Sequence, residues 1–125
     1  MVHCFILLKD ETPAQIKIST PTRYLKHFIC MEHTVTFRLK HSTGSPEEAD
    51  FLSALEKLAE IPGVKNFRIR RQVSPKNSHT FGLSIHFDSD EDFRAYSNHP
   101  LHDAFVQERW ITEVEDFQES DFEAM

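Results

Sequence analysis

The sequence has 125 residues, which is enough for one domain around a single hydrophobic core and too short for two. Its 20 acidic residues outnumber its 14 basic residues, and the net charge of −6 is opposite to that of a nucleic-acid-binding surface. No apolar run is long enough to span a bilayer, and residues 4–8 are too short and wrongly flanked for a signal peptide. We therefore expect a cytoplasmic protein that binds neither nucleic acid nor a membrane.

The first thirty residues differ from the rest of the chain. They contain Pro13 and Pro21 and show neither sustained alternation nor a helical face. We expect residues 1–30 to form an N-terminal extension, and two interpretations stay open. The first is a loosely ordered tail, or translation from a start upstream of a natural Met31. The second is that residues 2–9 add an extra edge strand or close over a partner subunit. Because both cysteines lie in this segment, no disulfide framework is expected in the domain of residues 31–125.

A regular pattern begins at Met31 with a predicted strand and helix. Alternation over residues 33–39 predicts a strand with one apolar and one polar face. Ser45 is a suitable N-cap, Pro46 suits the first helical position, and Glu48 can close a capping box, so a helix is expected to begin here and to end before Pro62-Gly63. The inward positions of the strand are His33, Val35, Phe37 and Leu39.

Two further strands are predicted as a hairpin. Residues 67–73 and 81–87 both alternate, and the polar segment between them predicts a turn. Val73 continues the apolar row of the second strand, which only Arg71 interrupts. The opposite face of the predicted sheet is polar, with Thr34, Thr36, Arg38, Arg68, Arg70, Ser84 and His86.

The remaining chain contains a helix that must break. Ser89 is an N-cap for this helix, but Pro100 lacks an N–H and disfavours the α conformation at His99, so the helix stops near Asn98 and a second one begins at Pro100. A last strand is expected over residues 111–118, although acids interrupt it. The predicted inner face of the restarted helix consists of Leu101, Ala104, Phe105 and Trp110.

The order of these elements is strand, helix, strand, strand, helix, strand. This order predicts the α+β, ferredoxin-like βαββαβ arrangement, in which the helices cover one face of an antiparallel sheet. The apolar strand faces then lie under the helices, and the polar face lies on the other side.

Several segments between about residues 31 and 122 carry a shared signature: His33 with Val35 and Phe37, Ile61-Pro62-Gly63-Val64, Phe87-Asp88-Ser89, Ala95-Tyr96, His99-Pro100-Leu101-His102 and Phe105-Val106. Together they resemble the stress-responsive dimeric α/β-barrel (Dabb) family. The resemblance implies that two sheets face each other in a homodimer, so that ferredoxin-like monomers form a dimeric α/β barrel. We then expect arginines of the polar face to pair with acids such as Glu113 or Glu115; the alternative is a monomer whose polar sheet face meets water.

Three side chains are candidates for chemistry. Alternation directs His33 toward the helices, and the helix break lets Tyr96 and His102 turn back toward the sheet. We expect them to meet in an apolar pocket, with His102 as a base and Tyr96 as a donor to a developing oxyanion. The predicted ligand pocket, beside this catalytic pair, consists of His33, Val35, Phe37, Phe51, Leu83, Ile85, His99 and Phe105.

Each candidate also has a purely structural interpretation. Tyr96 would be a core residue with its hydroxyl at the rim, and His33 a buried histidine hydrogen-bonded to a neighbour. His99 would bond backbone groups where Pro100 interrupts the helix. No metal site is expected, since His99 and His102 lack an ordered third ligand, and no cofactor is expected, since the chain has no glycine-rich phosphate loop.

Three functions therefore stay in competition. The first is a homodimeric Dabb-type domain that binds a small, partly apolar molecule between sheet and helices. The second is an enzyme; the resemblance to the family implies a polyketide-cyclase-like lyase or isomerase, in which Tyr96 and His102 carry proton abstraction and carbonyl activation. The third is a stability or assembly module whose pocket is filled by its own side chains.

Overall fold

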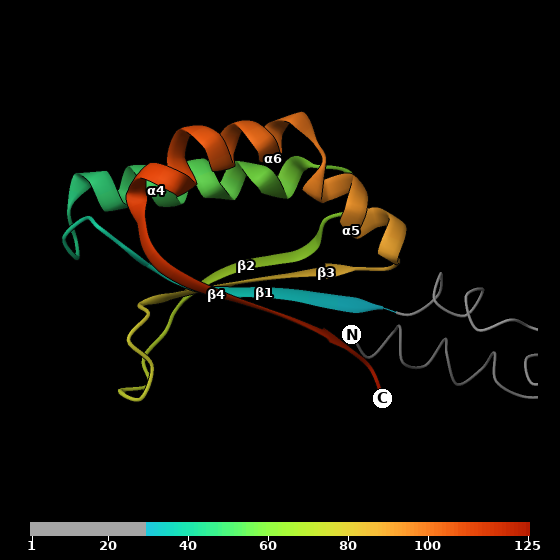
Figure 1. Ribbon diagram of the computed structural model, residues 1–125, viewed down its shortest axis with the longest axis horizontal. Coiled ribbons are helices and arrows are strands. Elements are labelled where there is room, and N and C mark those ends of the chain that lie inside the picture. The colour runs from blue at the N-terminus through green and yellow to red at the C-terminus, as the bar shows by residue number, and fades with distance from the viewer. Residues whose placement is uncertain (1–29) are drawn as a thin grey trace, which may run out of the picture.

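A four-stranded antiparallel sheet forms one layer of the protein and the helices form the other (Figure 1). The computed structural model describes residues 30–125, so the expectations for residues 1–29 lie outside the described part of the chain. The strand order is β2-β3-β1-β4, which confirms the ferredoxin-like prediction. The strands are β1 (Met31–Leu39), β2 (Lys65–Arg71), β3 (Phe81–Phe87) and β4 (Val114–Glu123).

The helices all lie on the same side of the sheet (Figure 1). Within residues 30–125, no helix is both long enough and apolar enough to cross a membrane. The helical segments are α4 (Pro46–Glu56), the 3₁₀ turn η2 (Lys57–Glu60), α5 (Asp90–Ser97), α6 (Pro100–Phe105), the π-helical turn η3 (Val106–Trp110) and α7 (Ile111–Glu113).

Helix α4 begins as its sequence predicts. The Ser45 hydroxyl accepts a hydrogen bond from the backbone N–H of Glu48 at 3.2 Å, and Pro46 takes the first helical position. The Glu48 carboxylate accepts the N–H of Gly44 at 3.0 Å, one residue before the donor of a standard capping box. Gly44 can present its N–H in this way because it adopts φ +81°, which glycine tolerates at little cost.

The core lies between the inner face of the sheet and the helices. Phe37 of β1 and Phe51 of α4 are both 0% exposed, and their ring centroids lie 6.1 Å apart. Trp110 extends this aromatic cluster, with its ring 5.1 Å from that of Phe37. These rings come from β1, α4 and η3, so the cluster holds the sheet and the helical layer together.

Three sequence predictions are wrong in detail. The last strand begins at Val114 rather than at residue 111, because residues 111–113 complete the helical segment. Val73 is 81% exposed and follows the end of β2, where the chain has left the sheet. Leu101 and Ala104 are exposed, while Phe105 is buried, so the inner face of α6 is rotated from the predicted one.

The outer face of the sheet carries polar pairs. Arg38 bonds Glu115 at 3.3 Å within the same chain, and Arg70 donates to the Ser84 hydroxyl at 3.1 Å. Glu113 pairs instead with Arg109 and His41, away from this face. Of the two acids named for such pairing, Glu115 pairs with an arginine of this face and Glu113 does not, while the pairing in the interior of a dimeric barrel stays a prediction.

Candidate active site

The break between α5 and α6 positions the two central side chains of the site. The Asn98 N–H still bonds the carbonyl of Arg94, but His99 turns to extended backbone and Pro100 begins the next helix. The Nδ1 atom of His99 accepts the N–H of Leu101 at 3.1 Å, so His99 serves as the N-cap of α6. Tyr96 and His102 thus come from different helices on either side of the corner.

A cavity of about 280 Å³ lies between these helices and the sheet. His33, Tyr96 and His102 all line it, so the corner brings the three expected proton-handling side chains together. The lining extends to Glu119 on the exposed edge strand β4, where the cavity reaches the surface. The complete lining is His33, Val35, Leu55, Leu58, Leu83, Tyr96, His102, Phe105, Val106, Trp110, Phe117 and Glu119.

Four residues of the predicted pocket do not line this cavity. Phe37, Phe51 and Ile85 are fully buried in the core, where neighbouring side chains cover them, and His99 caps α6. Sequence reasoning missed six lining residues, which come from α4, η2, η3 and β4. The sequence contains only a weak signal for them. Leu55 and Leu58 are spaced three apart, as residues on one helical face are, but nothing in the sequence distinguishes a cavity wall from packed core. The six are Leu55, Leu58, Val106, Trp110, Phe117 and Glu119.

Tyr96 lies between the two imidazoles. Its ring centroid is 4.7 Å from that of His102 and 6.2 Å from that of His33. Tyr96 is 2% exposed, and this burial raises the pKa of its hydroxyl far above the usual value, with a smaller contribution from the Glu119 carboxylate. The hydroxyl therefore stays protonated at neutral pH and acts as a hydrogen-bond donor rather than as a base.

His102 is a neutral imidazole at pH 7. Burial lowers its pKa below the ordinary value of 6.5, and the nearby His33 lowers this pKa further, while Asp103 opposes the shift. Its Nδ1 atom is buried without a hydrogen-bond partner among the described residues. His102 can consequently accept a proton from a bound molecule, but no carboxylate among residues 30–125 is hydrogen-bonded to its ring.

The lowered pKa of His102 predicts a pH-dependent stability. Because the unfolded chain binds this proton more readily than the folded chain, the free energy of unfolding falls as pH drops below about 6.5. We expect His102→Gln to reduce the loss of stability between about pH 7.5 and pH 5. Urea unfolding at both pH values measures this loss of stability. Equal losses in the variant and the wild type would contradict a lowered pKa of His102.

His33 has a different environment. It is 5% exposed, and its Nδ1 atom lies 2.6 Å from the Asp121 carboxylate of β4. The ring also packs against Phe93 of α5, with centroids 5.2 Å apart. His33 is therefore a buried, hydrogen-bonded histidine, as its structural interpretation expects, and it lines the cavity as well.

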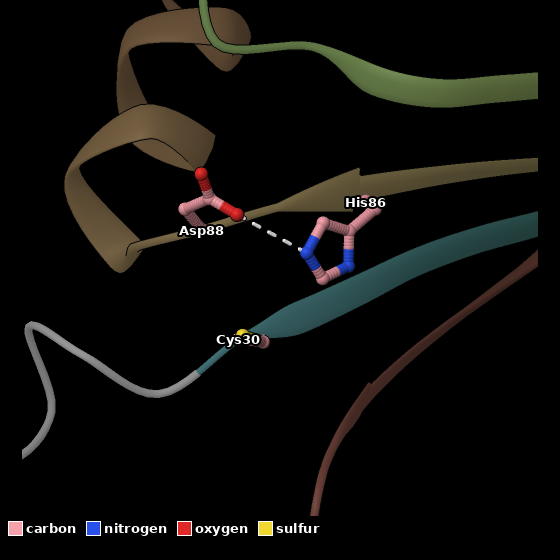
Figure 2. Close-up of side chains that lie close together, drawn as sticks. All are labelled: Cys30, His86 and Asp88. Carbon is pink, nitrogen blue, oxygen red and sulfur yellow. Dashed lines mark hydrogen bonds and ion pairs between the residues drawn. The ribbon is translucent and has the colours of Figure 1, made fainter. Parts of the chain in front are cut away.

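A second cluster of polar groups lies at the far end of β3 (Figure 2). Potential ligand atoms of Cys30, His86 and Asp88 lie within 4.8 Å of one another, and His86 bonds Asp88 at 3.2 Å. However, the Cys30 sulfur belongs to a disulfide, and Lys65 binds Asp88 and holds the pKa of that carboxyl below its ordinary value. Because these groups are already engaged, we do not assign a metal to the cluster.

Comparison with known proteins gives a family for most of the chain. Residues 31–124 match the family model described as Stress responsive A/B Barrel Domain, Dabb. A Dabb family protein with a ferredoxin-like fold from Mesorhizobium loti is 43% identical over 78% of this chain and 98% of its own, with a TM-score of 0.77. No curated protein matches the sequence.

More distant solved structures share the fold. A dimeric ferredoxin-like protein of unknown function from Thermobifida fusca is 27% identical over 77% of this chain and 92% of its own, with a TM-score of 0.63. A hydroxynitrile lyase from Passiflora edulis is 20% identical over 77% of this chain and 94% of its own, with a TM-score of 0.65. At that identity, the likeness to the lyase concerns the fold alone.

Proposed function

Because the chain belongs to the stress-responsive Dabb family, whose solved relatives include dimeric ferredoxin-like proteins, we propose that it is a homodimer that binds a small, partly apolar molecule. The observation that carries this proposal is the cavity of about 280 Å³ between the sheet and the helices. Its walls are mostly aliphatic and aromatic, and its few polar groups converge, which is the usual composition of a small-molecule site.

The lining also indicates the chemistry of the ligand. The cavity is larger than the roughly 150 Å³ cavities that hold benzene, so a substituted aromatic or short aliphatic molecule fits. The protonated hydroxyl of Tyr96 favours a ligand with a hydrogen-bond acceptor, such as a carbonyl oxygen. A small aryl ketone meets both requirements, and we choose phenylacetone as the probe.

Filling the cavity tests the proposal. Val106 lines the cavity, and we expect Val106→Trp to weaken phenylacetone binding at least about tenfold, because the indole occupies the ligand volume. Val73→Trp is the matched control, since Val73 is 81% exposed and outside the cavity. Ligand-observed NMR titration measures both dissociation constants. Equal affinities in the two variants, or no binding to the wild type, would favour a structural module instead.

A second candidate function is acid–base catalysis without a cofactor. The contact between Tyr96 and His102 favours it, because a hydroxyl donor and a neutral imidazole then face the same bound molecule. By its resemblance to cyclases of the family, this pair would promote proton abstraction and carbonyl activation. The reaction class would then be that of a lyase or isomerase.

A further inference from the structure

One imidazole of the cavity lining, that of His33, is hydrogen-bonded to an acid on the neighbouring strand. His33 of β1 and Asp121 of β4 are directly opposite each other in the antiparallel register. The side chains of such a pair project from the same face of a sheet, so the strands hold the Nδ1 atom and the carboxylate 2.6 Å apart. Asp121 is about two-fifths exposed, while the His33 side chain is almost completely buried.

This hydrogen bond determines which nitrogen of His33 carries the proton. A carboxylate only accepts, so Nδ1–H donates to Asp121, and Nε2 of the neutral ring is left unprotonated. Within residues 30–125, Nε2 has no hydrogen-bond partner, and the ring lines the cavity. Because the ring lines the cavity, this unprotonated nitrogen is the basic atom of His33 that a bound molecule can meet.

The two histidines of the cavity therefore differ in the hydrogen-bond partners of their rings. The ring of His102 has no carboxylate bonded to it, its Nδ1 is buried without a partner in the described chain, and burial disfavours its protonated form. Protonation of His33, by contrast, produces an imidazolium that Asp121 directly stabilises. The titratable groups that line the cavity beside His33 are Tyr96 from α5, His102 from α6 and Glu119 from β4, and Asp121 of β4 contacts His33.

We propose that His33, in place of His102 in the catalytic pair considered above, is the general base of this cavity, that Asp121 is its positioning residue, and that the substrates are carbonyl compounds with an acidic C–H beside the carbonyl. Nε2 takes the proton, the electron pair of the broken C–H bond moves into the carbonyl, and the resulting enolate oxygen accepts a hydrogen bond from Tyr96. The proton returns to carbon or leaves through solvent, so the step needs no further reactant. This inference depends on the proposed function, because the cavity must first take such a molecule.

Hydrogen–deuterium exchange at the benzylic carbon of phenylacetone in D₂O measures proton abstraction directly. We expect Asp121→Asn to lower kcat for exchange about tenfold or more with little change in KM, since the asparagine no longer stabilises the imidazolium. Glu123→Gln is the matched control: Glu123 is two residues away on the same face of β4, is exposed and does not line the cavity. We expect its rate to stay within about twofold of the wild type.

The ¹⁵N chemical shifts of the His33 ring provide a readout that requires no ligand. In the neutral ring, we expect protonated Nδ1 and bare Nε2 in the wild type and in Glu123→Gln, and a shift toward the Nε2–H tautomer in Asp121→Asn. An unchanged tautomer, or an unchanged kcat in Asp121→Asn, would overturn the assignment of His33 and Asp121. Failure of phenylacetone to bind the wild type would overturn the ligand site itself, whereas binding without any change in kcat would overturn only the base.

Discussion

Replacement of Phe51 by alanine is expected to lower the free energy of unfolding by about 3–5 kcal/mol. Phe51 is 0% exposed, and its ring packs 5.4 Å from that of Phe105 and 6.2 Å from that of Trp110. The ring thus joins α4 to the sheet and to the later helical segments, and its removal leaves a cavity bordered by rigid aromatic rings that cannot collapse into it. Typical domains have only about 5–15 kcal/mol of stability, so the loss is a large fraction of the total.

Denaturant unfolding measures this loss, and an exposed residue provides the control. Val73→Ala removes apolar atoms at a site that is 81% exposed, and we expect a change within about 0.5 kcal/mol. A loss below about 1 kcal/mol for Phe51→Ala would contradict the central position of this ring in the core.

The second large effect is expected from Tyr96→Phe. If the hydroxyl stabilises the enolate of a bound ketone, its removal should lower kcat for exchange into phenylacetone about a hundredfold or more, as the loss of an oxyanion donor does elsewhere. The phenyl ring keeps the contacts with His102 and with Phe87, whose rings lie 4.7 Å and 5.3 Å from that of Tyr96, so the fold should persist.

The affinity of Tyr96→Phe for phenylacetone distinguishes a chemical role of the hydroxyl from a structural one. The ground-state carbonyl loses one neutral hydrogen bond, so the dissociation constant of phenylacetone should rise only about tenfold. A wild-type kcat in Tyr96→Phe would exclude the hydroxyl from the reaction. A large loss of stability measured in parallel would instead identify Tyr96 as a core residue whose hydroxyl is needed for folding.

The sequence was sufficient for those features that depend on local pattern. Alternation placed His33 on the inner face of β1, and Pro100 predicted the corner that separates Tyr96 from His102. Helix starts were equally clear, because Ser45 and Ser89 are capping residues whose hydroxyls accept the expected backbone N–H groups.

Features that depend on tertiary pairing were not predictable in the same way. β4 is an edge strand whose side chains are mostly exposed, so it lacks the apolar alternation that identifies a buried strand. Its register against β1 brings Asp121 to His33 and Glu119 to the cavity, and no local signal in the sequence contains that register. Phe37 and Ile85 were predicted on the correct face of the sheet, but whether a core position lines a cavity depends on how several helices pack above it.

The π-helical turn at Val106–Trp110 makes the shape of the cavity wall depend on the number of residues in this segment. A π-turn contains one residue more than an α-helical turn, and loss of one residue here would return the segment to regular winding. The residues beyond the turn would keep their faces, because the wider turn takes up the extra residue, but the side chains within the turn, which include Val106 and Trp110 of the cavity wall, would be redistributed around the helix axis. The shape of the wall therefore depends on a single inserted residue, so related chains with a shorter connection would enclose a differently shaped space even if every lining side chain were the same.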